Sequence, residues 1–499
     1  MPVVLPKYLE EMMKVLPKPE SIWKYMLAVT QIPRGSNGEG EHFRHLKITS
    51  FLKERAEELN CQTYIDKGEN LIIRKAAFPG CEDKPTVCLQ CHMDMVVEKN
   101  DDVVIDFEKD PLTPRIVDGK WLMASGTSLG ADNGIGIATC FAILEDNSIQ
   151  HGPLEVLITR DEETGMFGAT DLEEGILKAK YLINVDSEEE NSICIGCAGG
   201  FTVNMTLPTP RESFPDSTQL TLTLNGFVGG HTGCDIDLGR ANPLHVISRL
   251  LSAVHDDYRV IAIQCGTADN AIPRKCVVSV AVATSQLDSF KKGIEFAFDC
   301  FKKEYHQIEK DATLTISNDS KDRLPISKEA TMQFVNFLNV CPFAVQRYSP
   351  VVKNAVETSM TCAIAKTLES SISFVASVRS SSSTQMDMMY NKLKCVVEMA
   401  GMSISEKKDP YPSWSPKADS FLTKAMVKAY EDVEHITPKV YAIHAGLECG
   451  LLETKYPEIE CVSIGPELQS PHSPCERLLI ESVPRYYSVL LAALKTLSM

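Results

Sequence analysis

Three short motifs in the first third of the chain carry side chains that could hold metal ions. They are His92-Met93-Asp94, Asp132 in the glycine-rich stretch Leu129–Gly134, and the doublet Glu162-Glu163. Each lies beside an apolar run, where a buried segment gives way to a loop. One imidazole and several carboxylates at such positions are the ligands that a pair of divalent ions needs. The pattern favours a hydrolase that activates water.

The spacing within these motifs indicates which side chains could be metal ligands and which could be a supporting carboxylate or a general base. On an extended strand residues i and i+2 point to the same side, so His92 and Asp94 face one way. A ligating histidine usually needs a carboxylate at its other ring nitrogen, and Asp94 could provide it. The neighbours Glu162 and Glu163 cannot both face one ion from an extended chain. We expect one of them as a ligand and the other as a general base.

Further ligands are expected to come from other parts of the chain. Asp132 has two carboxylate oxygens and could bridge two ions, and Asp186 adds another carboxylate. A second histidine is needed late in the chain, where His444 and His472 are both candidates. The residue types alone leave the choice between them open.

Bulk composition narrows the class of protein. The chain has 499 residues, too many for one core, so two or three domains are expected. Its apolar content is 44% and its charged content 23%, as in soluble globular proteins. The formal net charge is −17, which disfavours nucleic acid or an anionic membrane as a partner.

Cysteine usage and the lack of apolar spans predict a cytoplasmic protein. The 17 cysteines are an odd number in a long chain, unlike a secreted disulfide scaffold. The start, Met1–Lys7, has no signal-peptide core, and no apolar run approaches the ~20 residues of a membrane span. Cys194 and Cys197 have the spacing of a redox motif, but we interpret them as buried thiols on a strand.

Strands and helices alternate in the first part of the chain. Residues 86–91, 154–160 and 181–185 are short β-rich runs, while 134–144 and 42–59 have helical patterns. This alternation predicts an α/β domain with a mostly parallel sheet flanked by helices. Ligands collect at the carboxyl ends of such strands. The residues that follow the three predicted strands there are His92, Glu162 and Asp186.

The pattern changes at Gly199-Gly200, after which half-exposed strands such as 219–225 alternate in polarity. Helices near 240–254 and 286–304 flank a strand at 276–283, and a similar order recurs between 312 and 400. We expect an inserted α+β lid domain built of two tandem sheet–helix units. Helix 417–431 and a strand near 460–464 then rejoin the first sheet. The expected domains are 1–200 and 405–499, two parts of one catalytic domain, and the lid at 201–404.

Other chemistries fit the sequence less well. Gly134-Ile135-Gly136 invites a dinucleotide interpretation, but Thr139 stands where the third glycine belongs. A cysteine nucleophile at Cys91 beside His92 is poorly placed, since adjacent strand residues point apart. The chain has no phosphate-binding Walker loop, no His-Glu-x-x-His helix and no Gly-x-Ser-x-Gly elbow. A catalytically inactive scaffold is another alternative.

A longer series of motifs runs in one order from about residue 90 to 474. It comprises Cys91-His92-Met93-Asp94-Met95-Val96, Leu129-Gly130-Ala131-Asp132-Asn133-Gly134-Ile135-Gly136, His151-Gly152-Pro153-Leu154-Glu155-Val156, Asp161-Glu162-Glu163-Thr164-Gly165-Met166, Asn184-Val185-Asp186-Ser187-Glu188-Glu189, Gly196-Cys197-Ala198-Gly199-Gly200, Gly229-Gly230-His231-Thr232-Gly233, Asn270-Ala271-Ile272-Pro273-Arg274, His444-Ala445-Gly446-Leu447-Glu448-Cys449-Gly450, Gly465-Pro466 and His472-Ser473-Pro474. This series resembles the M20 family of metallopeptidases, and within it the Xaa-His (aminoacyl-histidine, carnosine-cleaving) dipeptidase type.

The resemblance implies a ligand set for two divalent ions, zinc or alternatively Mn²⁺ or Co²⁺. It places His92 and Asp186 on one ion and Glu163 and His472 on the other. Asp132 would bridge them, with a cis peptide between Asp132 and Asn133.

The resemblance also implies roles in catalysis and substrate binding. Asp94 would support the metal site, Glu162 would be the general base, and His231 would donate to the developing oxyanion. Glu162 would take a proton from the metal-bridging water, and the resulting hydroxide would attack the peptide carbonyl. The expected substrate-binding residues are Asn270, Arg379, His444 and Glu448.

The expected substrate is a small peptide, an Xaa-His dipeptide above all. A broader dipeptidase, a tripeptidase or an N-acyl amino-acid deacylase of the same family is the alternative. A homodimer and a monomer both stay open, because a doubled lid could supply lid residues within one chain.

Overall fold

The computed structural model describes residues 4–37, 45–318 and 323–499. They form two compact units, which are described separately below. Unit 1 comprises Met1–Gly196, Pro416–Ala442 and Leu447–Met499, and unit 2 comprises Cys197–Ser415 and Ile443–Gly446. The domain bounds expected from the sequence stay a prediction.

Unit 1 is built on a mixed sheet with the strand order β1-β2-β6-β3-β7-β22-β8-β21. Its centre, β6-β3-β7-β22, is parallel, and β2 and β8 pair antiparallel to the strands beside them. The strands are β1 (Gln62–Ile65), β2 (Leu71–Lys75), β3 (Val87–His92), β6 (Leu154–Thr159), β7 (Tyr181–Asn184), β8 (Ser192–Cys197), β21 (Lys439–Ile443) and β22 (Glu460–Ser463). Every residue of β3, β6 and β7 is buried, as in a sheet covered on both faces.

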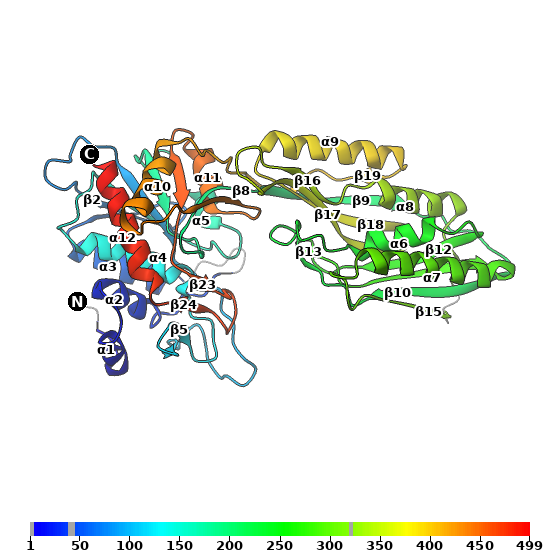
Figure 1. Cartoon of the computed structure of the whole chain (residues 1–499), viewed down its shortest axis with the longest axis horizontal. Helices are drawn as coiled ribbons and strands as arrows, with labels where there is room; N and C mark the ends of the chain where they lie inside the picture. The colour runs from blue at the N-terminus through cyan, green and yellow to red at the C-terminus, as the bar shows by residue number, and fades with distance from the viewer. Residues whose placement is uncertain (1–3, 38–44, 319–322) are drawn as a thin grey trace. The chain divides into compact units, whose positions relative to one another are not determined.

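The helices of unit 1 pack on its sheet or on one another (Figure 1). They are α1 (Lys7–Met13), α2 (Glu20–Val29), α3 (Leu46–Glu58), α4 (Ala131–Glu145), α5 (Phe167–Asp171), α10 (Phe421–Val433), α11 (Glu448–Lys455) and α12 (Ser482–Leu497). Helix α4 is apolar on all sides and nearly all of it is buried, because it packs against both α2 and β3. A small separate sheet pairs β4 (Pro114–Val117), β5 (Trp121–Ala124), β24 (Arg477–Leu479) and β23 (Leu468–Gln469).

Unit 2 is built on one large sheet whose main path is β15-β10-β14-β12-β17-β18-β9-β19. Its strands are β9 (Gly199–Pro208), β10 (Ser217–Asn225), β12 (Tyr258–Cys265), β14 (Cys276–Ala283), β15 (Thr313–Asn318), β16 (Ala344–Tyr348), β17 (Val356–Thr367), β18 (Ser371–Ser380), β19 (Ser403–Ile404) and β20 (Lys408–Tyr411). A separate two-stranded ribbon joins β11 (Gly230–His231) to β13 (Ala271–Ile272). The two sheet–helix units expected from the sequence therefore share one sheet.

The helices α6 (Pro243–Ser252), α7 (Leu287–Glu304), α8 (Lys328–Val340) and α9 (Ser383–Met399) pack on this sheet (Figure 1). A 3₁₀ turn, Thr284–Gln286, precedes α7. In β10, Leu220, Leu222 and Leu224 are buried in the core beneath the helices, and the threonines between them are half-buried. Alternation of this kind is typical of a sheet covered on one face.

The elements predicted from the sequence are confirmed with small shifts at their ends. The three predicted strands of the first part are β3, β6 and β7, and the predicted helix 134–144 is the main part of α4. The first residues of the helix predicted at 42–59 lie outside the described residues, and the rest forms α3. The predicted fold class, an α/β domain with an inserted α+β domain, is confirmed. Among the described residues, the helices are too short or too polar to cross a bilayer.

Candidate active site

Unit 1 brings the five predicted metal ligands together around one carboxylate. The two oxygens of Asp132 face two different histidines. Asp132 Oδ1 lies 3.0 Å from Nε2 of His92, and Oδ2 lies 3.1 Å from Nε2 of His472. The same nitrogen of His92 lies 3.4 Å from Asp186 Oδ1, and that of His472 lies 3.0 Å from Glu163 Oε2. The side chains thus form two sets of possible cation ligands that share Asp132.

The parallel centre of the sheet explains why these residues meet. His92 is the last residue of β3, and the segments that carry Glu163 and Asp186 follow β6 and β7. Parallel strands end at the same edge of a sheet, so the segments that carry His92, Glu163 and Asp186 lie close to one another there. Asp132 lies at the start of α4, and His472 lies in the loop between β23 and β24.

The backbone around Asp132 departs from regular helix. Gly130 has a φ of 66°, and the φ and ψ angles of Asp132 and Asn133 are not helical. The peptide between Asp132 and Asn133 is cis, as the resemblance implied. The amide of Asn133 donates to the carbonyl of Val185 at 3.0 Å and to the carboxylate of Asp186. The start of α4 is therefore tied to the segment that follows β7.

Asp94 organises the turn that carries the two glutamates. Its carboxylate accepts hydrogen bonds from the backbone N–H groups of Glu162 (3.0 Å) and Glu163 (3.2 Å) and from the hydroxyl of Ser36 (2.7 Å). Its Oδ1 also lies 3.3 Å from Nδ1 of His92. Burial opposes ionisation of Asp94, but the contacts with His92 outweigh it and hold the pKa below its usual value.

The carboxylates of the site crowd a buried space. Burial raises the pKa of Glu163 to about 7 and that of Asp186 to about 6, and the charge of Asp132 adds to both effects. The hydrogen bonds that the His472 ring donates to Asp132 and Glu163 raise its pKa to about 11. In the absence of other cations the imidazoles must take up protons to balance these charges.

A pair of divalent cations fits this donor set. Buried Glu163 Oε1 has no hydrogen-bond partner among the described residues, which leaves a lone pair to be satisfied. Ligand atoms of His92, Asp132 and Glu163 all lie within 4.8 Å of one another. Imidazole nitrogens with carboxylate oxygens suit Zn²⁺, and also Mn²⁺ or Co²⁺. Bound cations would remove the repulsion between the carboxylates without extra protons.

Glu162 lies beside this cluster and is not part of either ligand set. Its pKa is raised well above the usual value, first by burial and then by the charges of Asp186, Glu448 and Glu163, against the opposing effect of His92. A carboxylate with a raised pKa is suited to taking and giving protons near neutral pH.

Three charged residues near the site were missed in the sequence. The run Glu188–Glu190 has the pattern of a solvated loop, but Glu188 is half-buried, and burial with the nearby charge of Asp132 raises its pKa to about 8. Buried Arg34 and Glu476 contact the backbone on either side of Gly130. No local pattern marks them, because their partners lie far away in the sequence.

Unit 2 gathers the predicted lid residues around the ribbon β11–β13. Arg379 in β18 donates to the hydroxyls of Tyr411 (2.7 Å) and Thr232 (3.3 Å), and its Nη2 lies 3.4 Å from Nε2 of His231. The backbone carbonyl of Asn270 accepts a hydrogen bond from the N–H of Thr232 at 2.9 Å.

The tautomer of His231 follows from its backbone contacts. Its Nδ1 accepts hydrogen bonds from the N–H groups of Gly233 (3.3 Å) and Cys234 (3.1 Å). Burial and the neighbouring Arg379 lower its pKa, so the ring is neutral at pH 7 and carries its proton on Nε2. His231 Nε2 and Arg379 Nη2 are then both donors, and an oxygen anion between them would satisfy both.

The two residues predicted to form one substrate-binding segment lie in different units. In unit 2, Nε2 of buried His444 lies 2.7 Å from the hydroxyl of Ser359, and burial and Arg379 lower its pKa to about 3. In unit 1, buried Glu448 accepts hydrogen bonds from Gln90 (2.5 Å) and Thr159 (2.8 Å).

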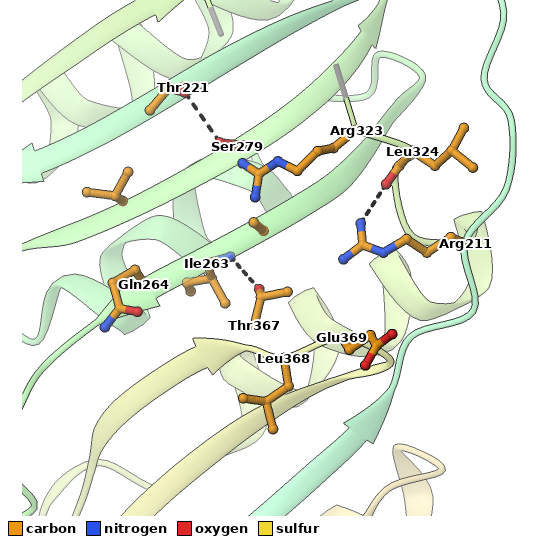
Figure 2. Close-up of a pocket in the computed structure, with 12 residues that line it drawn as sticks. Arg211, Thr221, Ile263, Gln264, Ser279, Arg323, Leu324, Thr367, Leu368 and Glu369 are labelled. Carbon is orange, nitrogen blue, oxygen red and sulfur yellow. Dashed lines mark hydrogen bonds between the residues drawn. The ribbon is translucent and has the colours of Figure 1, made fainter. Parts of the chain in front are cut away.

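Unit 2 also has a pocket of about 920 Å³ on its sheet (Figure 2). Figure 2 shows the side chain of Arg323 beside Ser279, and that of Arg211 next to the backbone of Leu324. Arg211 donates to the carbonyls of Ile261 (3.1 Å) and Leu324 (2.5 Å), so it supports the backbone there. None of the predicted site residues lines this pocket.

Comparisons with known proteins agree with this geometry. The model of peptidase family M20/M25/M40 matches residues 88–496, and the chain belongs to this family. It is 38% identical over 480 residues to the cytosol non-specific dipeptidase of Escherichia coli (strain K12), covering 96% of this chain and 97% of that protein. The chain is therefore an enzyme, a metallopeptidase with close dipeptidase relatives.

Solved structures share the fold of this chain. The crystal structure of the aminoacylhistidine dipeptidase from Vibrio alginolyticus matches with a TM-score of 0.89 and 37% sequence identity, over 97% of this chain and 98% of that chain. A tripeptidase from Staphylococcus aureus matches with a TM-score of 0.55 at 14% identity, which shows a shared fold alone.

Proposed function

We propose that this protein is a dinuclear metal-dependent dipeptidase that hydrolyses small dipeptides, Xaa-His dipeptides among them. The observation that carries the proposal is Asp132, whose two oxygens each face one histidine, and each of these histidines also contacts a further carboxylate. The names of the relatives from Escherichia coli and Vibrio alginolyticus support a dipeptide substrate. The first of these relatives is cytosolic by name, which supports a cytoplasmic location.

The proposed ligands divide between two cations. His92 and Asp186 would hold one, Glu163 and His472 would hold the other, and Asp132 would contact both. Two bound cations would lower the pKa of a water molecule and polarise the scissile carbonyl.

Glu162 is the proposed general base. Its carboxylate would take a proton from the attacking water and then pass a proton to the leaving amine. Asp94 supports this role, because it binds the backbone N–H groups of Glu162 and Glu163 and so sets the turn on which both side chains stand. It also faces Nδ1 of His92 and would keep Nε2 of that ring directed at the cation.

In unit 2, His231 and Arg379 are the proposed contacts with the charged or developing oxygens of the substrate. His231 offers a neutral Nε2–H, which suits donation to the oxyanion of the tetrahedral intermediate. Arg379 offers guanidinium donors to the substrate carboxylate, and its hydrogen bond to Tyr411 fixes its direction. Asn270, His444 and Glu448 stay proposed substrate-binding residues.

The test is hydrolysis by purified protein of a panel of equimolar substrates. The panel contains β-alanyl-histidine, glycyl-histidine, a dipeptide without histidine, a tripeptide and an N-acetyl amino acid. We expect the dipeptides to be cleaved, activity to disappear with a chelator, and Zn²⁺, Mn²⁺ or Co²⁺ to restore it. Cleavage of the tripeptide alone, or of the N-acetyl amino acid alone, would show that the enzyme acts on that class of substrate and not on dipeptides. No turnover of any substrate with metal present would overturn the proposal.

A further inference from the structure

The backbone segment Leu129–Asp132 is held on its N–H side by a carboxylate outside both ligand sets. Glu476 is buried, with 2% of its surface exposed. Its Oε2 accepts hydrogen bonds from the N–H groups of Leu129 (2.6 Å) and Gly130 (2.9 Å). Its Oε1 accepts from the N–H groups of Ala131 (2.7 Å) and Asp132 (3.3 Å). Four consecutive donors therefore converge on one side chain.

The same segment is held on its carbonyl side by an arginine. Arg34 is buried, with 1% of its surface exposed. One guanidinium nitrogen donates to the carbonyl of Gly130, and the other donates to the carbonyls of Met93 (3.2 Å) and Asp94 (2.8 Å). The Asp132 segment is thereby joined to the segment that carries His92 and Asp94.

Glu476 makes a second connection because of its place in the chain. It follows His472 by four residues, and its own N–H donates to the carbonyl of Ser473 at 3.0 Å. The loop that carries His472 is thus attached, through one carboxylate, to the backbone that carries Asp132. Together the two charged residues connect three segments that supply the proposed ligands.

The charges of Glu476 and Arg34 are also favourable at these positions. Residues 129–132 lead into α4, which starts at Ala131, and their four backbone N–H groups favour an anion. Gly130 precedes the helix without a side-chain cap, so Glu476 takes the place of the cap. The charge of Glu476 is the main interaction that favours the ionised form of buried Arg34.

We infer that Glu476 and Arg34 are positioning residues of the metal centre, which hold Asp132 between His92 and His472 at the spacing that two cations need. The inference rests on the proposed function. A Cβ at Gly130 would lie 2.5 Å from Nη2 of Arg34, so the segment has little room to move toward the arginine. If either charged residue is replaced, we expect the Asp132 backbone to shift and metal affinity to fall.

The first experiment compares Glu476→Gln with Glu481→Gln, a control at an exposed carboxylate five residues away. The amide has the same shape as the carboxylate, but it presents an NH₂ group to two of the four donors. We expect metal affinity, measured by titrating the chelator-stripped protein against a competing dye, to fall by about 10- to 100-fold in Glu476→Gln only. Activity should return at high metal concentration with little change in KM.

A second readout is independent of metal and of activity. In the chelator-stripped protein, hydrogen exchange of the peptide that covers residues 129–132 should be faster in Glu476→Gln than in Glu481→Gln. The matching pair for the arginine is Arg34→Lys with Arg115→Lys, since Arg115 is exposed. Lysine keeps the charge but cannot reach three carbonyls with a planar fork, so we expect the same direction of change in Arg34→Lys.

The outcomes separate the two proposals. Wild-type metal affinity and exchange in both Glu476→Gln and Arg34→Lys would overturn the inference and leave the dipeptidase proposal intact. Failure of both variants to fold, while their controls fold, would also overturn it, because the pair would then be a general requirement for folding. Wild-type protein that binds no metal would defeat the proposed function, and this inference with it.

Discussion

At the scale of single residues, the proposed two-cation site depends most on Asp132. A carboxylate can give one oxygen to each of two cations, whereas a single imidazole nitrogen cannot. In the structure its two oxygens face His92 and His472 at nearly equal distances. Burial, together with the charge of Asp132, raises the pKa values of Glu163 and Asp186, a situation that bound cations would relieve.

Replacing Glu162 tests the general base separately from the ligands. In Glu162→Gln the shape is kept and the proton acceptor is lost, so we expect kcat to fall by about 10²- to 10⁴-fold. KM and the metal content per chain should stay unchanged, because Glu162 belongs to neither ligand set. Initial-rate kinetics with elemental analysis would measure all three, with exposed Glu189→Gln as the control. A Glu162→Gln enzyme with wild-type kcat would exclude the residue as the base.

Residue types and spacing, together with the family motifs, predicted the residues that gather around Asp132. His92, Asp132 and Glu163 each follow or precede an apolar run, and the family motifs resolved the choice between His444 and His472. Glu476 and Arg34 could not be predicted in this way. Glu476 meets Leu129 from 347 positions away, and a charged residue in a loop carries no local sign that it will be buried.

At the scale of elements, the parallel strands β3, β6 and β7 place the site. Their continuous apolar runs predict buried strands, and parallel pairing follows from the helical segment between them. The pairing and register of the strands in unit 2 could not be predicted in this way. The pairing of β9 with β18 joins segments about 170 positions apart, as in Gly200 with Arg379, and the alternating pattern of each strand does not specify its neighbour. That pairing places Arg379 in unit 2.

Helix α6 carries a histidine that should make the stability of unit 2 depend on pH. The ring of His245 stacks on Phe343 with centroids 4.9 Å apart, and its buried Nε2 has no hydrogen-bond partner among the described residues. Burial lowers its pKa to about 4. Below about pH 6.5 the His245 ring is protonated in the unfolded chain, whereas in the folded unit it stays neutral down to about pH 4. Stability should therefore fall by up to ~1.4 kcal/mol per pH unit in that window.

Denaturant unfolding of unit 2 at pH 7 and pH 5 would measure this effect. His245→Gln removes the titrating group, so the loss of stability between the two pH values should be smaller than in the wild type. His255 is exposed and provides the control, His255→Gln. Buried His444, whose pKa is lowered to about 3, keeps part of the dependence in every variant. An unchanged dependence in His245→Gln would contradict the prediction.

At the scale of the whole molecule, the two units have different parts of the predicted chemistry. All five proposed metal ligands lie in unit 1, and His231, Asn270, Arg379 and His444 lie in unit 2. The sequence predicted an insertion because the strand pattern changes at Gly199-Gly200, and elements that rejoin the first sheet return only at 417–431. It could not predict that the chain crosses between the units again at Ile443–Gly446, which separates His444 from Glu448.

This division predicts that metal removal destabilises one unit only. Cations bound to the folded state stabilise it by RT ln(1 + [L]/Kd), which is about 4 kcal/mol at a thousandfold excess over Kd. Stripping the cations also restores repulsion among Asp132, Glu163 and Asp186. Scanning calorimetry with and without a chelator should therefore show two transitions, of which only that of unit 1 moves to lower temperature.

The unit 2 transition can be identified by the shift that His245→Gln gives it at pH 5, and returning Zn²⁺ should restore the other transition. In Glu163→Gln, which lacks one proposed ligand, the shift caused by the chelator should be smaller than in the wild type. Equal movement of both transitions would mean that the units unfold together and that metal stabilises the whole chain. No movement of either transition would show that the cluster around Asp132 holds no cation in the folded protein.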